Sequence, residues 1–526
     1  MNRKFLSIIC LLLCFSTLLA SCVQSNTSQS QAQGEPGIEQ LLNMPYVVPE
    51  NLMTVEQYQT EVQNLLKGQN FITATDEYLA NIERLGDGLR DSIIYSTNDI
   101  TECTGTKYYI SNNGNDSNNG KSPETAWATL GKLKTVRLKA GDLVLLERGS
   151  MWRETLPCVN GVTYSAYGEG YKPRVWNSVN GLKFEWVQTE TPNVWKYDPE
   201  EKGLFDVGVV VYDYGNSFGQ QKSNIEGLKK QGDFVYLGTA ADIEKEMRDY
   251  CLYVYSEKNP KEFYKAIDIA KSGGTIKLSA DAKNITVNNL EMLYGINFYF
   301  LTNPQNIVVS DCIFGWQGGQ TEASTGVRYG GGGGAWLSCY NLVFDHCYLY
   351  QQFDCAVTPQ YDGGLGSDIS IFKKFIVKNC MIETSEYGLE YFTSQKGTDD
   401  NKITDMYLGY NFFRDIGKGF GVKHGRSACV KSWEHENTTY DSVIEYNIFD
   451  RPFSLSLEIT GKKQENGKLA YDNKLIPVIR NNVYIAVKDR KFNRVNGVDY
   501  KFNEDSYNKL KSAGIETGSL YVFAKN

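Results

Sequence analysis

The sequence has few of the residues that metal and nucleic-acid sites usually need. Only three of the 526 residues are histidine (His346, His424 and His435), and no Cys-x-x-Cys pair occurs. The spacing of a zinc site is therefore missing. No cluster of Lys or Arg is present, and the formal net charge is -8. We expect no resident metal and no nucleic-acid partner.

The apolar run at the N-terminus is too short to span a membrane. It covers residues 5–19, after two basic residues, and the sequence Leu-Ala-Ser-Cys then ends at Cys22. A spanning helix needs about 18 to 20 apolar residues. The pattern predicts a secretory signal over 1–22 that is removed, with Cys22 lipidated as the new N-terminus. We expect an exported protein of the bacterial cell envelope that contacts the membrane through this lipid alone.

The cysteines do not have the pattern of a disulfide framework. Twelve are present, but Cys10 and Cys14 leave with the signal and Cys22 takes lipid, which leaves an odd number, nine, scattered along the chain. We expect most of them to be buried free thiols that pack as small apolar groups.

Composition divides the next part of the chain into segments. Residues 23–36 are mostly Ser, Gln and Asn and predict a flexible tether. Apolar residues recur at helical spacing in 37–104, which we predict to be a small helical region packed against one end of the main body. A second helical pattern predicts a C-terminal cap within 501–526.

A repeated phrase indicates the fold of the main body. Short strand-like segments share one column at intervals of 22, 35, 33, 31, 36 and 35 residues, and its members are Leu290, Cys312, Cys347, Cys380, Asn411, Asn447 and Asn482. A period in this range indicates stacked repeats. The repeats contain Gly and Asn turns and no helix-length pattern, so each strand must pair with the next coil. We predict a parallel β-helix in which the last three Asn side chains form a buried ladder.

The repeat also sets the remaining boundaries. We predict residues 105–180 to be the first part of the β-helix and 285–500 to be its main coils. Residues 181–284 lack the phrase and are predicted to be an inserted β-rich subdomain. The longer repeats carry extra loop residues beside one stretch of the coil, where they can wall a binding groove.

Several phrases resemble a known superfamily. They are a tyrosine-rich strand, a Gly-Asn-Asp-Ser loop and a Gly-Asp strand that ends in Arg-Gly, at Tyr108-Tyr109, Gly114-Asn115-Asp116-Ser117 and Gly141 to Gly149. These are similar to the opening of secreted proteins of the pectate-lyase-like superfamily, and the likeness continues over most of the chain from Thr106 onward. The resemblance implies an all-β chain folded as a right-handed parallel β-helix, or solenoid. Less directly it implies a carbohydrate substrate, because the superfamily contains polysaccharide lyases, glycoside hydrolases and members without an assigned activity.

Matched strands place ionisable residues in one column. If the apolar residues at alternate positions point inward, an outward column at intervals of 32, 33 and 35 residues contains Thr358, Glu390, Lys423 and Glu458. His424 follows Lys423 directly, and Asp354 lies just before the strand of Thr358. The candidate catalytic residues are Glu390, Asp354, Lys423, Glu458 and His424. An ion-pair ladder on an exposed sheet is the alternative interpretation.

Residues around this column are candidates for sugar binding. Aromatic rings can stack on pyranose rings, and a guanidinium suits an acidic sugar or a pair of hydroxyls. The glycines at 330–334 are expected to form a loop at the groove, because five glycines pack poorly inside a strand. The candidate substrate-binding residues are Arg328, Tyr329, Trp316, Gln360, Glu386, Arg426 and Trp433.

Two enzyme mechanisms and one binding function fit this pattern. A glycoside hydrolase would use two carboxylates. A uronate lyase would use Lys423, His424 or Arg426 as a base, with an arginine or a calcium ion to neutralise the substrate carboxyl. No dense Asp cluster for calcium is visible, which favours hydrolysis without a cofactor. The third hypothesis is a non-catalytic glycan-binding or adhesin-like lipoprotein. In each case we expect a monomer whose partner is a polysaccharide or oligosaccharide.

Overall fold

The computed structural model describes residues 37–44, 46–197, 206–238, 251–271, 273–279, 281–295, 299–300, 303–321, 326–361, 370–393, 401–421, 426–432, 439–461 and 476–525. The predicted signal, Cys22 and the tether lie outside these ranges. Among the described residues, no helix is both long enough and apolar enough to cross a membrane.

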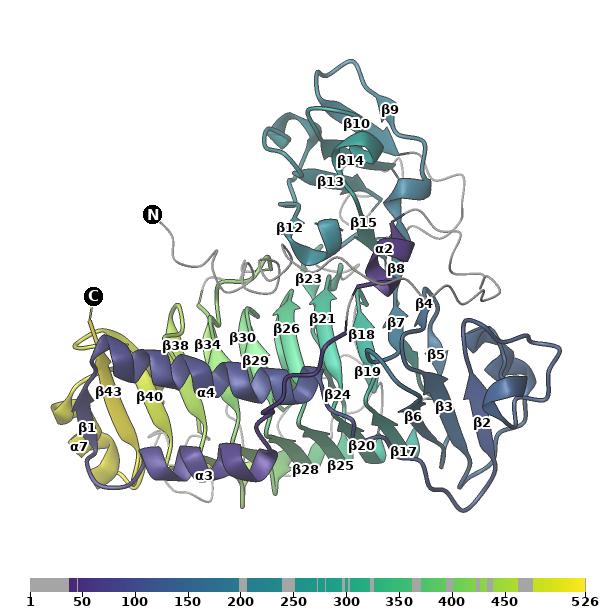
Figure 1. Cartoon of the computed structure of the whole chain (residues 1–526). Helices are drawn as coiled ribbons and strands as arrows, with labels where there is room; N and C mark the ends of the chain where they lie inside the picture. The colour runs from purple at the N-terminus through teal and green to yellow at the C-terminus, as the bar shows by residue number, and fades with distance from the viewer. Residues whose placement is uncertain are drawn as a thin grey trace.

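Most described strands belong to three long sheets that run along the molecule (Figure 1). Sheet 1 has the order β1 (Phe71–Thr73), β43 (Leu520–Ala524), β40 (Val483–Val487), β37 (Ile448–Asp450), β33 (Phe412–Arg414), β29 (Met381–Glu383), β26 (Tyr348–Gln352), β21 (Ile313–Gln317), β18 (Glu291–Leu293), β7 (Arg174–Trp176) and β4 (Met151–Trp152). Sheet 2 has the order β2 (Lys107–Ile110), β3 (Leu143–Glu147), β6 (Thr163–Tyr167), β17 (Lys283–Asn288), β20 (Gln305–Ser310), β25 (Cys339–Asp345), β28 (Ile371–Lys378), β32 (Tyr407–Gly409), β36 (Val443–Glu445) and β39 (Val478–Arg480). Two further strands join it, because β31 (Lys402–Thr404) pairs with β28 and β35 (Thr439–Tyr440) pairs with β31. Sheet 3 has the order β19 (Tyr299–Phe300), β24 (Gly333–Trp336), β27 (Cys355–Gln360), β30 (Tyr387–Tyr391), β34 (Ala428–Ser432), β38 (Leu455–Ile459), β41 (Lys491–Val495) and β42 (Val498–Lys501).

Successive repeats contribute successive strands to each sheet, and these strands pair in parallel. The exception is β42 at the end of sheet 3, which pairs antiparallel with β41. In sheet 1, for example, Phe314 pairs with Leu349, which in turn pairs with Ile382. These three side chains are fully buried in the main hydrophobic core, which continues from coil to coil. The expected parallel stacking in a mostly β chain is confirmed.

The Asn column forms the predicted buried ladder. The Oδ1 atom of Asn447 accepts from the backbone N–H of Asn411 at 3.1 Å and from its Nδ2 at 2.9 Å. The Oδ1 atom of Asn482 accepts from the same two groups of Asn447 at 3.0 and 3.1 Å. All three side chains are fully buried. The ladder is confirmed, and it satisfies backbone groups inside the coil that water cannot reach.

Most cysteines are also buried inside the protein. The described part of the chain contains nine cysteines, all of them free, and only Cys103 is not buried. In the coils that precede Asn411, the same column position holds Cys312, Cys347 and Cys380, and these three side chains are fully buried. The prediction of buried free thiols is confirmed.

The corner between sheet 2 and sheet 1 has a left-handed backbone. One residue before each column position φ lies between 53° and 60°, at Asn289, Asp311, His346, Asn379, Tyr410, Tyr446 and Asn481. Asn and Asp tolerate this conformation better than most residues because their short side chains bond locally. A single residue at each corner therefore redirects the chain from one sheet to the next.

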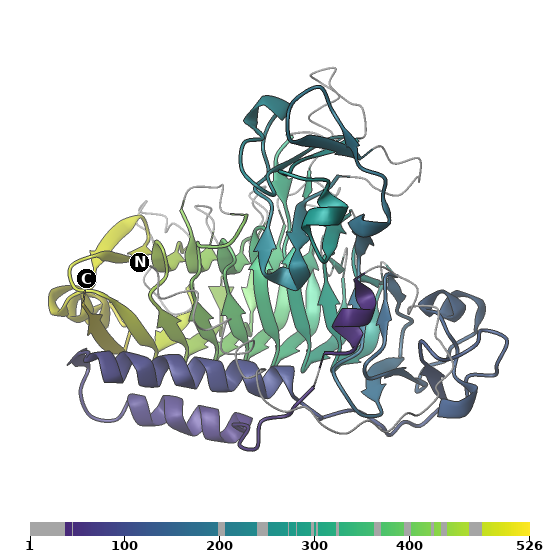
Figure 2. The same ribbon diagram turned by 45° about the horizontal axis from the view of Figure 1, so that its top comes forward.

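Two N-terminal helices lie over part of sheet 1, along the coil axis. The N-caps Thr54 and Thr75 begin α3 (Val55–Leu65) and α4 (Asp76–Ile94), each accepting a backbone N–H three residues on, at 3.2 and 3.1 Å. The 19 residues of α4 make a helix about 28 Å long, which matches about six strands at about 4.8 Å spacing. Figures 1 and 2 show both helices lying along the coil axis.

The expectation that these helices pack against one end of the body was therefore wrong. Sheet 1 turns apolar side chains outward, among them Met381 and Phe412, and these share one buried cluster with Ile82, Leu85 and Leu89 of α4. An apolar sheet face needs a cover, and the amphipathic helix α4 supplies it over about six of the eleven strands.

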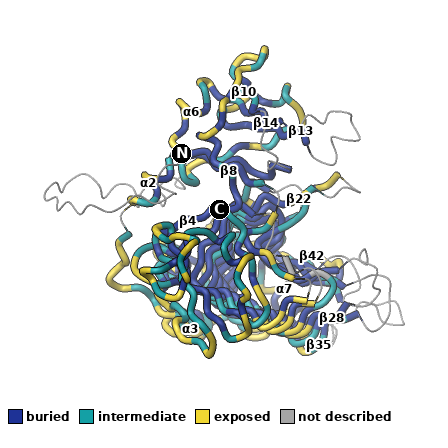
Figure 3. Tube along the Cα trace, turned by 90° about the vertical axis from the view of Figure 1, so that its right-hand side faces the viewer, coloured by how far each residue is buried: buried dark blue, intermediate teal, exposed yellow. Residues whose placement is uncertain are grey.

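A separate pair of antiparallel sheets stands above the coil (Figures 1 and 3). One has the order β13 (Phe234–Leu237), β14 (Cys251–Tyr255), β10 (Val194–Tyr197) and β9 (Val187–Gln188), and the other has the order β12 (Ser217–Phe218), β11 (Val209–Tyr212), β15 (Ile267–Ala270) and β8 (Ser178–Asn180). They have their own core, which includes Val210, Tyr212 and Leu252. Most of these strands fall within the range 181–284, whose boundaries stay predictions.

The remaining elements are short. They are α2 (Ile38–Leu42), α6 (Pro260–Phe263), the two-stranded pairs β5 (Leu156–Pro157) with β16 (Ile276–Lys277) and β22 (Gln320–Thr321) with β23 (Arg328–Tyr329), and 3-10 turns at η3 (Pro123–Thr125), η4 (Leu130–Thr135), η5 (Gly181–Lys183), η6 (Asp213–Gly215) and η7 (Ile225–Gly227). At the C-terminal end, α7 (Glu504–Ser512) occupies the stretch predicted to be helical. It buries Tyr507 and Leu510 in the main core with Tyr521 of the last strand.

Candidate active site

The predicted column lies on sheet 3, but one of its members was assigned wrongly. Glu390 pairs with Lys431, and Lys431 pairs with Glu458. Lys431 therefore occupies the position predicted for Lys423. Together with His424 and Trp433, Lys423 lies outside the described residues.

The error came from the wrong choice of strand. The phrase that begins at Phe420 was matched to its neighbours, whereas Phe420 and Gly421 belong to a turn and the strand is β34. Its sequence Ala-Cys-Val-Lys matches Cys-Ala-Val-Thr of β27 in size and polarity. That likeness could have identified Lys431 as the member of the column. The match was missed because a fixed repeat length was assumed, whereas the loops between strands vary in length.

The column is buried and does not face solvent, contrary to the prediction. Glu390, Lys431 and Glu458 expose 3%, 5% and 1% of their surface. The alternative of a weak, exposed ion-pair ladder does not apply to such residues. Buried charges are costly unless they are paired, so each of these groups must be balanced by its neighbours.

Glu458 is balanced by two arginines. Arg426 approaches it with both arms of the guanidinium, Nη2 at 2.5 Å from Oε1 and Nε at 3.1 Å from Oε2, while Arg494 lies 3.9 Å away. Such two-armed contacts are among the stronger ion pairs in proteins. Two residues predicted for catalysis and substrate binding, Glu458 and Arg426, are thus bonded to each other.

Asp354 and Glu390 come together on adjacent coils. Asp354 immediately precedes β27 and Glu390 lies on β30, and side-chain atoms of Asp354, Cys355 and Glu390 all lie within 4.8 Å of one another. Each of the two acids exposes only 3% of its surface. The backbone carbonyl of Asp354 accepts the N–H groups of Glu386 at 3.0 Å and of Tyr387 at 3.2 Å, which fixes the turn that carries it.

The glycine run brings a backbone amide to Asp354. The N–H of Gly330 donates to Oδ2 of Asp354 at 3.2 Å, which favours the ionised carboxylate. The expected loop is only partly correct, because Gly333 and Gly334 begin strand β24 and pair with β27. A Cβ atom at Gly334 would collide with the carbonyl of Thr358. The glycines thus permit an unusually close approach of the two backbones.

Lys431 is held against a tyrosine beside these acids. Its Nζ donates to Oη of Tyr387 at 3.0 Å and lies 4.1 Å from the centre of the ring. Burial raises the pKa of Tyr387, and the charges of Glu386, Glu390 and Asp354 raise it further. The phenol therefore stays neutral, next to three carboxyl groups.

The same cluster is a poor fit for a metal ion. Asp354, Cys355 and Glu390 are spaced closely enough to hold one. However, burial raises the pKa of the Cys355 thiol, and the charges of Asp354 and Glu390 raise it further. A metal ligand must be the thiolate, so this set offers a metal two carboxylates and a neutral thiol.

Arg328 and Trp316 are built into the interface with the upper sheets. Arg328 is buried, donates to the carbonyls of Gly318 at 3.1 Å and Gly319 at 2.9 Å, and forms an ion pair with Asp206. Trp316 exposes 5% of its surface and packs with its ring centre 5.5 Å from that of Phe218. Both side chains are thus used in packing and pairing, and their predicted sugar-binding roles stay predictions.

The other predicted sugar-binding residues in the described part of the chain are Gln360, Glu386 and Tyr329. Gln360 lies on β27, where its Oε1 accepts from Oγ1 of Thr358 at 2.9 Å, close to the column. Glu386 is fully buried beside Tyr387. Tyr329 is half-buried on β23.

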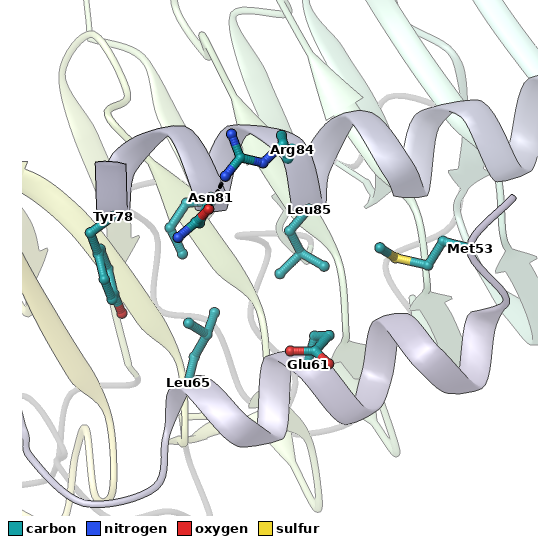
Figure 4. Close-up of a pocket in the computed structure, with 8 residues that line it drawn as sticks. Met53, Glu61, Leu65, Tyr78, Asn81, Arg84 and Leu85 are labelled. Atoms are coloured by element: carbon teal, nitrogen blue, oxygen red, sulfur yellow. Dashed lines mark hydrogen bonds between the residues drawn. The ribbon is translucent and has the colours of Figure 1, made fainter. Parts of the chain in front are cut away.

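A cavity of about 390 Å³ lies elsewhere, between α3 and α4. Figure 4 shows its lining residues, which are Met53, Glu61, Leu65, Tyr78, Asn81, Ile82, Arg84 and Leu85. This cavity belongs to the helical layer over sheet 1. Asp354 and Glu390 lie on sheet 3, so the cavity is not part of their site.

Comparison with known proteins gives local and distant likenesses. No family model matches the chain. Over 125 residues it is 30% identical to the lacto-N-biosidase of Bifidobacterium longum subsp. longum, a match that covers 22% of this chain and 8% of that protein. The structure of XylC with xylose is 11% identical with a TM-score of 0.43, covering 79% of this chain and 82% of that one. The GH136 lacto-N-biosidase from Eubacterium ramulus is 13% identical with a TM-score of 0.36, covering 80% and 71%.

Proposed function

We propose that this protein is an extracytoplasmic, lipid-anchored glycoside hydrolase built on a right-handed parallel β-helix. The observation that carries the proposal is the carboxylate pair, because Asp354 and Glu390 have side-chain atoms within 4.8 Å on adjacent coils. The local identity to a lacto-N-biosidase supports a sugar substrate. The handedness of the coil and the anchor at Cys22 rest on the resemblance and on the signal pattern.

The separation of the two acids fits a double displacement with retained configuration. Retaining enzymes place their carboxyl groups about 5 to 5.5 Å apart, whereas inverting enzymes need about 6.5 to 9.5 Å to fit a water molecule. Two carboxyl groups this close do not both ionise without a large cost, so the pair carries one proton. The amide of Gly330 favours the anion at Asp354, which leaves the proton on Glu390.

In this mechanism Asp354 is the nucleophile and Glu390 is the acid and base. An Asp354 oxygen bonds to the anomeric carbon while the glycosidic bond breaks, and the leaving oxygen takes the proton of Glu390. Glu390 then accepts a proton from the water that hydrolyses the glycosyl ester. Lys431, the strand partner of Glu390, stabilises the carboxylate that Glu390 becomes.

The test is a set of charge-removing variants on a panel of oligosaccharides and polysaccharides. Glu390→Gln should lower kcat at least about a hundredfold with the fold intact. Asp354→Gly should be as impaired, and added azide should restore turnover and give a glycosyl azide. Glu445→Gln is the matched control, because Glu445 pairs with Arg480 on sheet 2, away from the site. Near-normal turnover of Glu390→Gln would overturn the assignment.

The second candidate is β-elimination on a uronate. The specific observation in its favour is the contact between Lys431 and Tyr387, which places an ammonium and a phenol beside the carboxyl groups. Unsaturated products, with Lys431→Met inactive and Glu390→Gln active, would establish a lyase. New reducing ends without unsaturation indicate a hydrolase, and no product on a broad panel indicates a glycan-binding protein.

A further inference from the structure

The short hairpin of β22 and β23 connects the upper sheets to the candidate site. Its two strands pair antiparallel, with Thr321 opposite Arg328. The residue that follows β23 is Gly330, whose backbone N–H donates to Oδ2 of Asp354 at 3.2 Å. The position of this amide on the carboxylate is therefore set by whatever holds the hairpin in place.

Asp206, which lies just before β11 of the upper sheets, holds both strands of the hairpin. Its Oδ2 accepts the backbone N–H of Thr321 at 2.7 Å, and its Oδ1 accepts the hydroxyl of Thr321 at 2.9 Å. The guanidinium of Arg328 lies 2.5 Å from Oδ1. Asp206 and Arg328 are both buried, so water does not compete for these bonds. One carboxylate thus binds β22 and β23 at once.

Arg328 extends this contact to the turn that carries Asp354. Its Nη1 donates to the carbonyls of Gly318 at 3.1 Å and Gly319 at 2.9 Å, at the end of β21. Its guanidinium carbon lies 5.8 Å from the centre of the Phe353 ring. Since Phe353 directly precedes Asp354, the side chain of Arg328 packs against the segment before the acid, and its strand carries the amide that binds the acid.

The backbones of the upper sheets and the coil touch directly beside Asp206. A Cβ atom at Gly208 would lie 2.2 Å from the carbonyl oxygen of Gly318. No side chain fits in that space, and two glycines permit the approach. The junction is therefore close-packed, which fixes the position of Asp206 relative to the hairpin.

We propose that Asp206 is a positioning residue that holds the Gly330 amide on the Asp354 carboxylate through the hairpin of β22 and β23. The inference rests on the proposed function, in which Asp354 is the nucleophile. The amide favours the ionised carboxylate and fixes the direction of its oxygens, and both effects assist attack on the anomeric carbon. The upper sheets thus complete the catalytic site without contacting the reacting atoms.

Two variants that break comparable ion pairs separate positioning from stability. Asp206→Asn keeps the shape of the side chain and removes its charge. Asp268→Asn is the matched control, because Asp268 of β15 pairs with Arg153 at 2.6 Å and also joins the upper sheets to the coil. Arg153 follows β4, which lies four strands from β26, about 19 Å along the coil from the turn of Asp354. Both variants should lower the thermal stability of the whole protein.

Only Asp206→Asn should change the chemistry of the site. On the substrate that the panel identifies, it should lower kcat about tenfold to a hundredfold, the effect of one hydrogen bond to a charged group, with KM within about twofold. Asp268→Asn should keep the wild-type kcat. A second readout needs no substrate: hydrogen exchange of the Gly330 amide, resolved by fragmentation mass spectrometry, should be at least about tenfold faster in Asp206→Asn than in Asp268→Asn.

The two readouts also separate this inference from the proposed function. If the wild type cleaves nothing on the panel, the proposed function fails, and exchange of the Gly330 amide alone decides whether Asp206 positions it. Equal exchange in the two variants would overturn the positioning role, and so would a kcat that decreases equally in both. If Asp206→Asn does not fold, Thr321→Val replaces it, since this change removes one bond to Asp206 and leaves the ion pair. It should show the same changes at a smaller size, and wild-type exchange and kcat in Thr321→Val would overturn the proposal.

Discussion

The buried Asn ladder gives the clearest prediction about stability. Replacing Asn447 by Leu keeps the volume of the side chain but removes both halves of its amide. The backbone N–H and the Nδ2 of Asn411 lose their acceptor, and the carbonyl of Leu408, to which Nδ2 of Asn447 donates at 2.9 Å, loses a donor. Oδ1 of Asn482 loses one of its two donors and keeps the backbone N–H of Asn447. None of these groups can turn to water, because the site is fully buried.

The size of the effect follows from the number of groups left without a partner. Each buried unsatisfied group costs about 1 to 3 kcal/mol. At least two such groups remain, since the carbonyl can keep a second bond. The burial of a leucine offsets part of this cost. We therefore expect Asn447→Leu to lower the free energy of unfolding by about 1 to 4 kcal/mol, which is a large effect for a single substitution.

Guanidinium denaturation, followed by both fluorescence and circular dichroism, measures this change. Asn508→Leu is the matched control, because it makes the same chemical change at an exposed position of α7. We expect that control to change the free energy of unfolding by less than about 0.5 kcal/mol. If Asn447→Leu also costs less than about 1 kcal/mol, the register that aligns the ladder is wrong.

Three further predictions concern buried charges. Burial raises the pKa of Glu516 to about 7, above the unfolded value of about 4.3, so the stability it contributes is complete below about pH 4 and is lost as the pH rises to about 7. Denaturation at pH 5 and pH 8 should show Glu516→Gln to be more stable than the wild type at pH 8 alone, by about 3 kcal/mol. Arg328→Met should cost about 3 to 5 kcal/mol by leaving Asp206 unpaired, whereas a sugar-binding role would raise KM and leave thermal stability unchanged. Lys431→Met should move the acidic limb of the kcat/KM profile to higher pH, because the carboxylates lose a neighbouring cation; an unmoved limb would exclude that electrostatic role.

The sequence predicted the coil well because its period is a physical requirement. A buried position must recur once per coil, so Cys312, Cys347 and Asn411 stand in one column whatever the loops do. The corner before it needs a left-handed residue, which explains the recurrent Asn and Asp. Both signals are local, and they survive changes in loop length.

The site was harder to predict because it depends on register far from that column. The chain between Glu390 and Lys431 is longer than in neighbouring coils, and a fixed interval selected Lys423 instead. Burial of the column also depends on what covers it, which alternation of apolar residues along a strand cannot reveal. Asp354 and Glu390 were both candidates from the sequence, and the parallel pairing of β27 with β30 brings them within 4.8 Å of each other.

The three sheets of the coil differ in what their outer faces can do. Part of the outer face of sheet 1 is apolar and packs against α4. The outer face of sheet 2 is exposed at Gln305, Asn306 and Lys373, residues that water solvates at no cost. Sheet 1 buries charges as well, at Arg174, Glu291 and Asp450, but Arg174 lies 3.7 Å from Glu291 and Arg451 lies 2.7 Å from Asp450, so each of these carboxylates has an arginine partner. Sheet 3 differs because the carboxyl groups of Asp354 and Glu390 are buried close to each other on adjacent coils. Burying two like charges together is costly, and such pairs are typical of sites that perform acid and base chemistry.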